Sequence, residues 1–171
     1  MSAVAWPRVL CYAVLLLLLT SGCTQSKTAT VPSRPTSSVD EIVFPALPTG
    51  AGEIAKDAPK QFTQTASGLR YRMLRAGKGA MPAATDTVKV NYHGWLDGGK
   101  VFDSSYDRNA PISFPLNQVI KGWTEGMQLV GEGGMIELEV PSALGYGDSG
   151  VPGTIPSGAS LHFLVELLKI E

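Results

Sequence analysis

The chain has 171 residues and a formal net charge of −1 at pH 7. This length predicts one domain with accessory segments, and the near-neutral charge argues against a broad attraction to nucleic acid, so no nucleic-acid partner is expected. The 19 glycines and 12 prolines favour a fold rich in strands and loops over a helical bundle.

Residues 1–22 have the features of an export signal. Arg8 gives a weakly positive start, residues 9–19 (VLCYAVLLLLL) form an uninterrupted apolar run, and small residues follow. The run is shorter than the roughly 20 residues that cross a bilayer comfortably. It therefore predicts the core of a signal peptide, with a buried core helix as the alternative.

Cys23 indicates how this signal would be removed. Residues 19–23 (LTSGC) resemble the lipobox, where lipoprotein signal peptides are cut before a cysteine that carries a diacylglyceryl group, although Thr20 stands where Leu is usual. Cys11 would leave with the signal, and a lone free thiol suits an oxidising compartment poorly. We expect a lipidated Cys23 that anchors the protein to a bacterial membrane, facing the periplasm or the exterior. The alternative is an ordinary secreted protein that is cut nearby.

Residues 23–63 are expected to form a flexible tether. They are rich in Thr, Ser, Pro, Ala and Gly and show no sustained periodicity, which is typical of extended, semi-flexible segments. The apolar patch EIVFPALP, residues 41–48, is the one part that can dock locally. The folded domain is predicted to span residues 64–171, about 108 residues, which is enough for one core.

Four segments of the domain alternate apolar and polar residues, which predicts strands buried on one face: 67–74, 87–96, 135–140 and 160–170. In the first segment Arg70 and Arg72 alternate with the apolar residues, and in the third Glu137 and Glu139 do so.

A helix is predicted where apolar residues recur at spacings of 4, 3, 4 and 3: Leu116, Ile120, Trp123, Met127 and Val130. Gly122 and Gly126 indicate that only the middle of this segment is helical. The order of strands, then helix, then strands predicts an α+β fold, a strongly bent antiparallel sheet with a single short helix across its concave face.

The stretch VFDSSYDRNAPISFPL, residues 101–116, offers many polar groups but neither histidine nor cysteine. Ser104 and Ser105 have no nearby base, so a hydrogen-bonded bend is the simpler interpretation. His93 and His162 lack ligand-like neighbours, so no metal is expected. The glycine-rich stretches match no phosphate-binding fingerprint, and no cofactor is expected.

Six aromatic residues are predicted to face inward: Tyr92, Phe102, Phe114, Trp123, Tyr146 and Phe163. Plain core packing is the alternative for most of them. However, Tyr146 lies in a loop, ALGYGDSGVPGTIP, that holds four glycines and two prolines. A loop that only connects two strands does not need so many glycines and prolines, so this loop is a candidate part of a site.

Three stretches in order resemble an FKBP-type peptidyl-prolyl isomerase domain: VKVNYHGWLDGGKVFDSSYDRNAPISFPL, QVIKGWTEGMQLVGEGG and ALGYGDSGVPGTIPSGASLHFLVELLKIE. The resemblance covers essentially all of residues 67–171. It implies a twisted antiparallel β half-barrel that wraps one short α-helix, in agreement with the pattern of predicted elements. The leader further resembles those of bacterial lipoprotein members. Because the tether is short, unlike the long helical domain of dimeric members, a monomer is expected.

The resemblance implies catalytic roles for six residues: Asp103, Tyr146, Trp123, Phe102, Tyr92 and Phe163. It implies substrate-binding roles for six more: Val119, Ile120, Ile112, Phe114, Ile155 and Arg108. Trp123 would form the pocket floor, and Asp103 would make a polar contact near the reacting carbonyl while it pairs with Arg108 and Tyr92. A purely structural role is the alternative for Asp103.

Three positions depart from the family pattern: Ile112, Val151 and Thr154. We expect these changes to alter the preference for the residue before proline and the affinity for macrolides of the FK506 and rapamycin type. The expected activity is acceleration of X-Pro isomerisation in unfolded or exported polypeptides. The alternative is a non-catalytic chaperone or adaptor module that uses the same pocket.

Overall fold

The computed structural model describes residues 43–171. The predictions for the signal peptide and for Cys23 lie outside this range. Within it, the elements are β1 (Thr63–Gln64), β2 (Arg70–Arg75), β3 (Thr87–Leu96), β4 (Val101–Ser104), β5 (Ile112–Pro115), the 3₁₀ turn η1 (Leu116–Gln118), α1 (Lys121–Met127), β6 (Met135–Val140), η2 (Ser142–Leu144) and β7 (Leu161–Ile170). None of the helices in residues 43–171 is long and apolar enough to cross a membrane.

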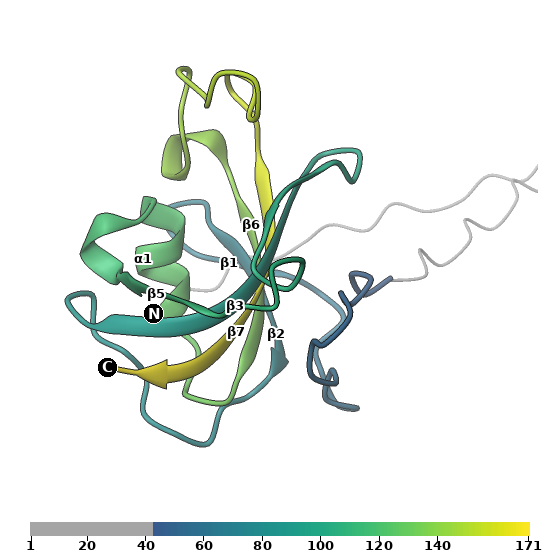
Figure 1. The fold of residues 1–171 in the computed structure, drawn as a ribbon, viewed down its shortest axis with the longest axis vertical. Coiled ribbons are helices and arrows are strands. Elements are labelled where there is room, and N and C mark those ends of the chain that lie inside the picture. The colour runs from purple at the N-terminus through teal and green to yellow at the C-terminus, as the bar shows by residue number, and fades with distance from the viewer. Residues whose placement is uncertain (1–42) are drawn as a thin grey trace, which may run out of the picture. The chain divides into compact units, whose positions relative to one another are not determined.

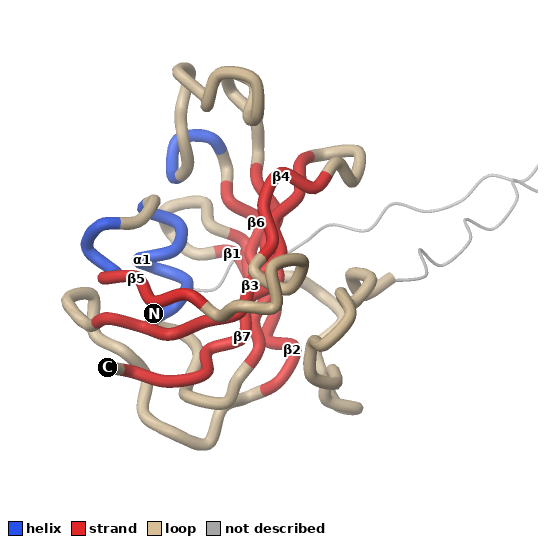
Figure 2. Tube along the Cα trace, in the orientation of Figure 1, coloured by secondary structure: helices blue, strands red, loops and turns tan. Residues whose placement is uncertain are grey.

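All seven strands belong to one antiparallel sheet in the order β1-β2-β6-β7-β3-β4 (Figures 1 and 2). Strand β5 pairs with the first half of β3, and β4 pairs with the second half. The sheet curves around α1, which lies on one of its faces. This arrangement confirms the predicted α+β half-barrel with one short α-helix.

The core lies between the concave face of the sheet and α1. Strand β3 shows the predicted alternation most clearly, with every second residue buried, and in β7 Leu161, Phe163, Val165 and Leu167 are all at most 4% exposed and belong to this core. Their burial removes apolar surface from water, which stabilises the fold by roughly 25 cal/mol per Å².

Helix α1 packs unusually close to β6, and two glycines make this possible. A Cβ atom on Gly122 would lie 2.5 Å from Val140 Cγ1, and one on Gly126 would lie 2.7 Å from Leu138 Cδ2. Helix α1 covers only Lys121–Met127, the middle of the segment as predicted, and both glycines lie inside it. Close packing against β6 offsets their low helix propensity, which costs about 1 kcal/mol each.

Residues 43–62, which we call the strap, cover the face of the sheet opposite α1 (Figure 1). Phe44, Ala51 and Ile54 pack against a second apolar cluster formed by Leu74, Met135 and Leu164. The expected tether of residues 23–63 therefore differs from the structure in its second half. The physical reason is that this outer face carries apolar side chains, which the strap removes from water.

The strap also buries charges that the strand pattern placed on a polar face. Arg72 and Glu137 are only 3% and 6% exposed, and Arg72 Nη2 lies 2.5 Å from Glu137 Oε2. The Arg72 guanidinium donates to the carbonyl of Lys60 at 3.0 Å and lies 4.6 Å from the ring centre of Phe44. Burial raises the pKa of Glu137, while the Arg72 guanidinium opposes that rise. A buried pair of this kind needs every remaining donor satisfied, and the strap supplies acceptors.

Gly122→Ala is expected to lower the free energy of unfolding by about 1–3 kcal/mol, because its Cβ would overpack Val140. Denaturant unfolding of the purified protein measures this change. Lys121→Ala, at an exposed position of the same helix, serves as the control and should stay within about 0.5 kcal/mol of wild type. A Gly122→Ala variant as stable as wild type would contradict the close packing.

Candidate functional site

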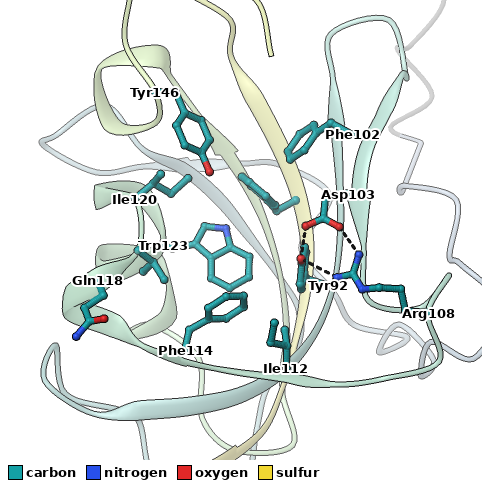
Figure 3. Close-up of a pocket in the computed structure, with 12 residues that line it drawn as sticks. Tyr92, Phe102, Asp103, Arg108, Ile112, Phe114, Gln118, Ile120, Trp123 and Tyr146 are labelled. Atoms are coloured by element: carbon teal, nitrogen blue, oxygen red, sulfur yellow. Dashed lines mark hydrogen bonds and ion pairs between the residues drawn. The ribbon is translucent and has the colours of Figure 1, made fainter. Parts of the chain in front are cut away.

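A cavity of about 740 Å³ opens between α1, the curved sheet and the loop after β6 (Figure 3). It is lined by Tyr92, Phe102, Asp103, Arg108, Ile112, Phe114, Gln118, Val119, Ile120, Trp123, Tyr146 and Phe163. The structure thus brings together all but one of the residues predicted for the site. They come from β3, β4, β5, β7, α1 and the connecting loops, so no single stretch of sequence contains the site.

Ile155 is the exception among the predicted site residues. It is 6% exposed, packs into the core and forms a two-residue bridge with Val151, each N–H donating to the other's carbonyl at 2.8 Å. Together with Val151 and Thr154 it lines a separate, smaller hollow. Of the three departures from the family pattern, only Ile112 borders the main cavity.

Gln118 lines the cavity but was not predicted. It is an exposed polar residue at the end of η1, and neither charge nor periodicity distinguishes it in the sequence. Its position directly before Val119 and Ile120 was the available signal.

The floor of the cavity is a cluster of aromatic rings centred on Trp123. The indole is 4% exposed, and the rings of Tyr92, Phe114 and Phe163 meet it edge-on at centroid distances of 5.4, 5.7 and 5.4 Å. Edge-to-face pairs of this kind contribute about 0.5–1.5 kcal/mol beyond burial. The floor is therefore held in a fixed, apolar shape.

Gly94 in β3 makes room for one wall of the cavity. A Cβ atom here would lie 2.7 Å from the ring of Phe102 and 3.0 Å from that of Phe163. The two rings meet edge-on over this glycine, with centroids 5.5 Å apart. A backbone position without a side chain thus lets both aromatics approach the sheet.

A polar group of three residues borders the aromatic floor on one side (Figure 3). The Tyr92 hydroxyl donates to Asp103 Oδ2, Arg108 Nη1 donates to Asp103 Oδ1 at 2.5 Å, and Arg108 Nη2 donates to the Tyr92 hydroxyl at 3.0 Å. Burial and the bond to Asp103 raise the pKa of Tyr92 to about 12. Desolvation acts to raise the pKa of Asp103, but hydrogen bonds from Tyr92 and Arg108 outweigh it and hold that pKa below its ordinary 3.8. The carboxylate therefore carries a fixed, oriented charge at neutral pH.

Asp103, in the second half of β4, and Arg108, in the turn after that strand, both belong to residues 103–110, which we call the bend. Ser105 is fully buried, and its hydroxyl accepts from the Tyr92 N–H at 2.9 Å and donates to Asn91 Oδ1 at 3.1 Å. Further backbone bonds close the turn, including Asn109 N–H to the Tyr106 carbonyl at 2.9 Å. The serines thus hold the bend in place, and neither faces a base.

Residues 43–171 contain no group of three or more His, Cys, Asp or Glu side chains that could hold a metal ion. His162, in β7, lies 2.7 Å from Asp97 and stacks on Trp95. What the cavity offers is an apolar floor, one exposed tyrosine hydroxyl at Tyr146 and an oriented carboxylate.

The family model described as FKBP-type peptidyl-prolyl cis-trans isomerase matches residues 78–168. The chain belongs to the FKBP family. A probable FKBP-type peptidyl-prolyl cis-trans isomerase of Haemophilus influenzae is 51% identical over 119 residues, which are 70% of this chain and 48% of the relative. The isomerase FkpA of Escherichia coli strain K12 is 50% identical over 117 residues, which are 68% of this chain and 43% of the relative. This FKBP chain thus spans about half the length of the curated relatives it matches.

Two crystal structures show the same FKBP fold. FkpA from Escherichia coli superposes with a TM-score of 0.63 at 48% identity, over 64% of this chain and 51% of that one. AtFKBP13 superposes with a TM-score of 0.62 at 33% identity, over 65% of this chain and 99% of that one. The recognition of the family from three stretches of sequence is confirmed.

Asp103→Asn is expected to lower the free energy of unfolding at neutral pH, with a deficit that closes in acid. The pKa of Asp103 is lower in the folded protein than its ordinary 3.8, so its stabilising contribution is present above the unfolded pKa and is lost as the pH falls through the folded pKa. Urea unfolding of both proteins from about pH 2 to pH 7 measures the difference. A deficit that stays constant across this range would rule out the charge-dependent contribution.

Proposed function

We propose that the protein is a peptidyl-prolyl cis-trans isomerase that accelerates rotation of X-Pro bonds in exported polypeptides. The observation that supports this most strongly is the cavity, whose aromatic floor is Trp123, in a chain of the FKBP family. The residues that line this cavity include no nucleophile–base pair. A site without a nucleophile suits a reaction in which no covalent bond is made or broken.

The chemistry of the X-Pro bond explains why a dry pocket would suffice. Amide resonance keeps the bond planar, and the barrier to rotation is about 18–20 kcal/mol. The planar form places charge on the carbonyl oxygen, which water stabilises, whereas the twisted form loses this charge. An apolar pocket therefore disfavours the planar form relative to the twisted one. Each 1.36 kcal/mol or so of this difference gives about a tenfold gain in rate.

In this proposal the proline ring lies on Trp123, between walls that include Phe102 and Phe163. The Ile120 N–H, at the start of α1, and the Tyr146 hydroxyl bind carbonyls of the peptide and hold it in a bent conformation, which adds a contribution from orientation. Asp103, fixed by Arg108 and Tyr92, places its charge beside the reacting carbonyl. Ile112 and Gln118 border the cavity where the residue before proline would lie.

A non-catalytic binding module is the second candidate, because the same pocket would bind proline-containing segments without accelerating rotation. The complete aromatic set favours the enzyme: Tyr92, Phe102, Trp123, Tyr146 and Phe163 all line one cavity. In either case FK506-like macrolides are expected to compete with peptides for this pocket.

We further propose that the mature protein begins at a lipidated Cys23, is held to a bacterial membrane by that group and acts as a monomer. The apolar run of residues 9–19 and the LTSGC sequence support the lipid anchor. Proline-containing chains that emerge across the membrane would then be the substrates.

The test of the enzymatic function is a protease-free assay that follows the refolding of a protein limited by proline isomerisation. Wild type should accelerate the slow phase, FK506 should block it, and Trp123→Leu should reduce kcat/KM by about tenfold or more, because the floor under the proline ring is lost. Tyr146→Phe should reduce it less, since the ring is 43% exposed and only the hydroxyl is removed. Circular dichroism confirms that each variant is folded. A folded wild-type protein that binds FK506 but leaves the slow phase unchanged would favour the binding module.

Cys23→Ser is expected to abolish the acyl modification when the full chain is produced in a bacterial host, because the thiol that carries the diacylglyceryl group is gone. Detergent-free fractionation and intact-mass analysis of the wild type should find it in the membrane fraction with a mass increase from acyl chains. Cys11→Ser, within the predicted signal peptide, is the matched control and should leave membrane attachment unchanged. Soluble wild type with an unmodified mass would exclude the anchor.

A further inference from the structure

Glu166 in β7 is a buried carboxylate outside the pocket. It is 5% exposed and accepts three hydrogen bonds: from the Tyr106 hydroxyl at 2.6 Å, from Arg75 Nη2 at 2.7 Å and from the Gly52 N–H at 3.1 Å. Burial of a carboxylate is costly unless it is paired and hydrogen-bonded, and these donors satisfy that requirement. They come from the bend, β2 and the strap, so one carboxylate joins three separate parts of the chain.

Tyr106 connects Glu166 to the catalytic side of the domain. It lies in the bend, between Asp103 and Arg108, and is 7% exposed. Burial and the bond to Glu166 raise its pKa far above the ordinary value, so the hydroxyl stays a donor. Because backbone bonds hold the bend together as one unit, the phenol fixes the position of the whole turn.

The strap meets Glu166 at a residue that must be small. A Cβ atom on Gly52 would lie 2.6 Å from Glu166 Oε1 and would also collide with the guanidinium of Arg75. The strap and the bend approach each other nearby as well, since Thr49, Gly50, Tyr106 and Asn109 line one small hollow. The strap therefore contacts the carboxylate of Glu166, the same group that holds the bend through Tyr106.

We propose that the strap positions the polar side of the pocket through Glu166 and Tyr106, which makes these two residues positioning residues of the isomerase site. The inference rests on the proposed isomerase function. Glu166 and Tyr106 lie outside the group that lines the cavity and act through the bend that carries Asp103 and Arg108. The strap, which precedes the domain boundary predicted from sequence, thereby becomes part of the active enzyme.

The side chain of Glu166 makes its hydrogen bonds to Gly52, Arg75 and Tyr106 and none to the aromatic rings of the floor, which gives the proposal a distinctive signature. Trp123 and Phe163 are held by their own edge-to-face contacts, so binding of the proline ring should persist when the bend loosens. The Asp103 charge acts on the reacting carbonyl, where a shift of about 1 Å can cost a large factor in rate. Loss of the hydrogen bond between Tyr106 and Glu166 should thus reduce kcat more than it raises KM.

The experiment measures kcat and KM with a proline-containing tetrapeptide for wild type, Tyr106→Phe, Glu166→Gln and Gly52→Ala. We expect kcat to fall by about three- to tenfold and KM to change by less than about twofold, the pattern of an interaction expressed in the transition state. FK506 affinity, measured by tryptophan fluorescence, should stay within about twofold of wild type. The Tyr106→Phe change should have no further effect in an Asp103→Asn background, because Tyr106 acts through that carboxylate.

Glu137→Gln is the matched control, since Glu137 is an equally buried carboxylate beneath the strap, paired with Arg72 and not with the bend. It should lower the unfolding temperature without changing kcat. Tyr71→Phe removes a hydroxyl elsewhere on β2 and should leave kcat unchanged. An active wild type with Tyr106→Phe at the same kcat would overturn this inference alone, as would equal losses in Glu137→Gln and Glu166→Gln. An inactive wild type would overturn the proposed function and this inference with it.

Discussion

The position of Trp123 depends on how closely α1 approaches β6. Gly122 and Gly126 remove the side chains that would keep the helix away from Val140 and Leu138. With the helix this close, the indole lies within reach of rings from β3, β5 and β7, and four separate elements meet on one floor. Backbone packing, which involves no functional group, thus determines where the aromatic floor of the pocket forms.

Much of the concave side could be predicted from sequence because one physical rule governs it. Alternating apolar residues in β3, β6 and β7 and the helical spacing around Trp123 all report burial against a single core. The same rule gave the wrong burial for charged residues on the opposite face of the sheet. Arg72 and Glu137 read as polar positions of half-buried strands, but the strap covers them, and a pattern within one strand does not reveal what another segment places on top of it.

The residues of the site also divide into those that could be predicted from the sequence and those that could not. Apolar and aromatic lining residues were found through the family resemblance and their inward positions, and the structure gathers them in one cavity. Gln118 and Ile155 were misjudged because loop geometry alone decides whether a residue faces the cavity or the core. Tyr106 carried no signal at all, since its partner Glu166 is sixty residues away in sequence. Such long-range polar contacts depend on strand order, which local patterns do not encode.

The order of strands has a consequence for synthesis. Strand β7, at residues 161–170, lies between β6 and β3; it pairs with β3 along nearly its whole length and with β6 over residues 161–166. Until these last residues leave the ribosome, the two halves of the sheet have no strand to join them, and the chain before them cannot close its core. Contacts between residues so distant in sequence also slow folding. The domain therefore stays open until β7 has been synthesised, and segments made before it remain without their sheet partner for that time.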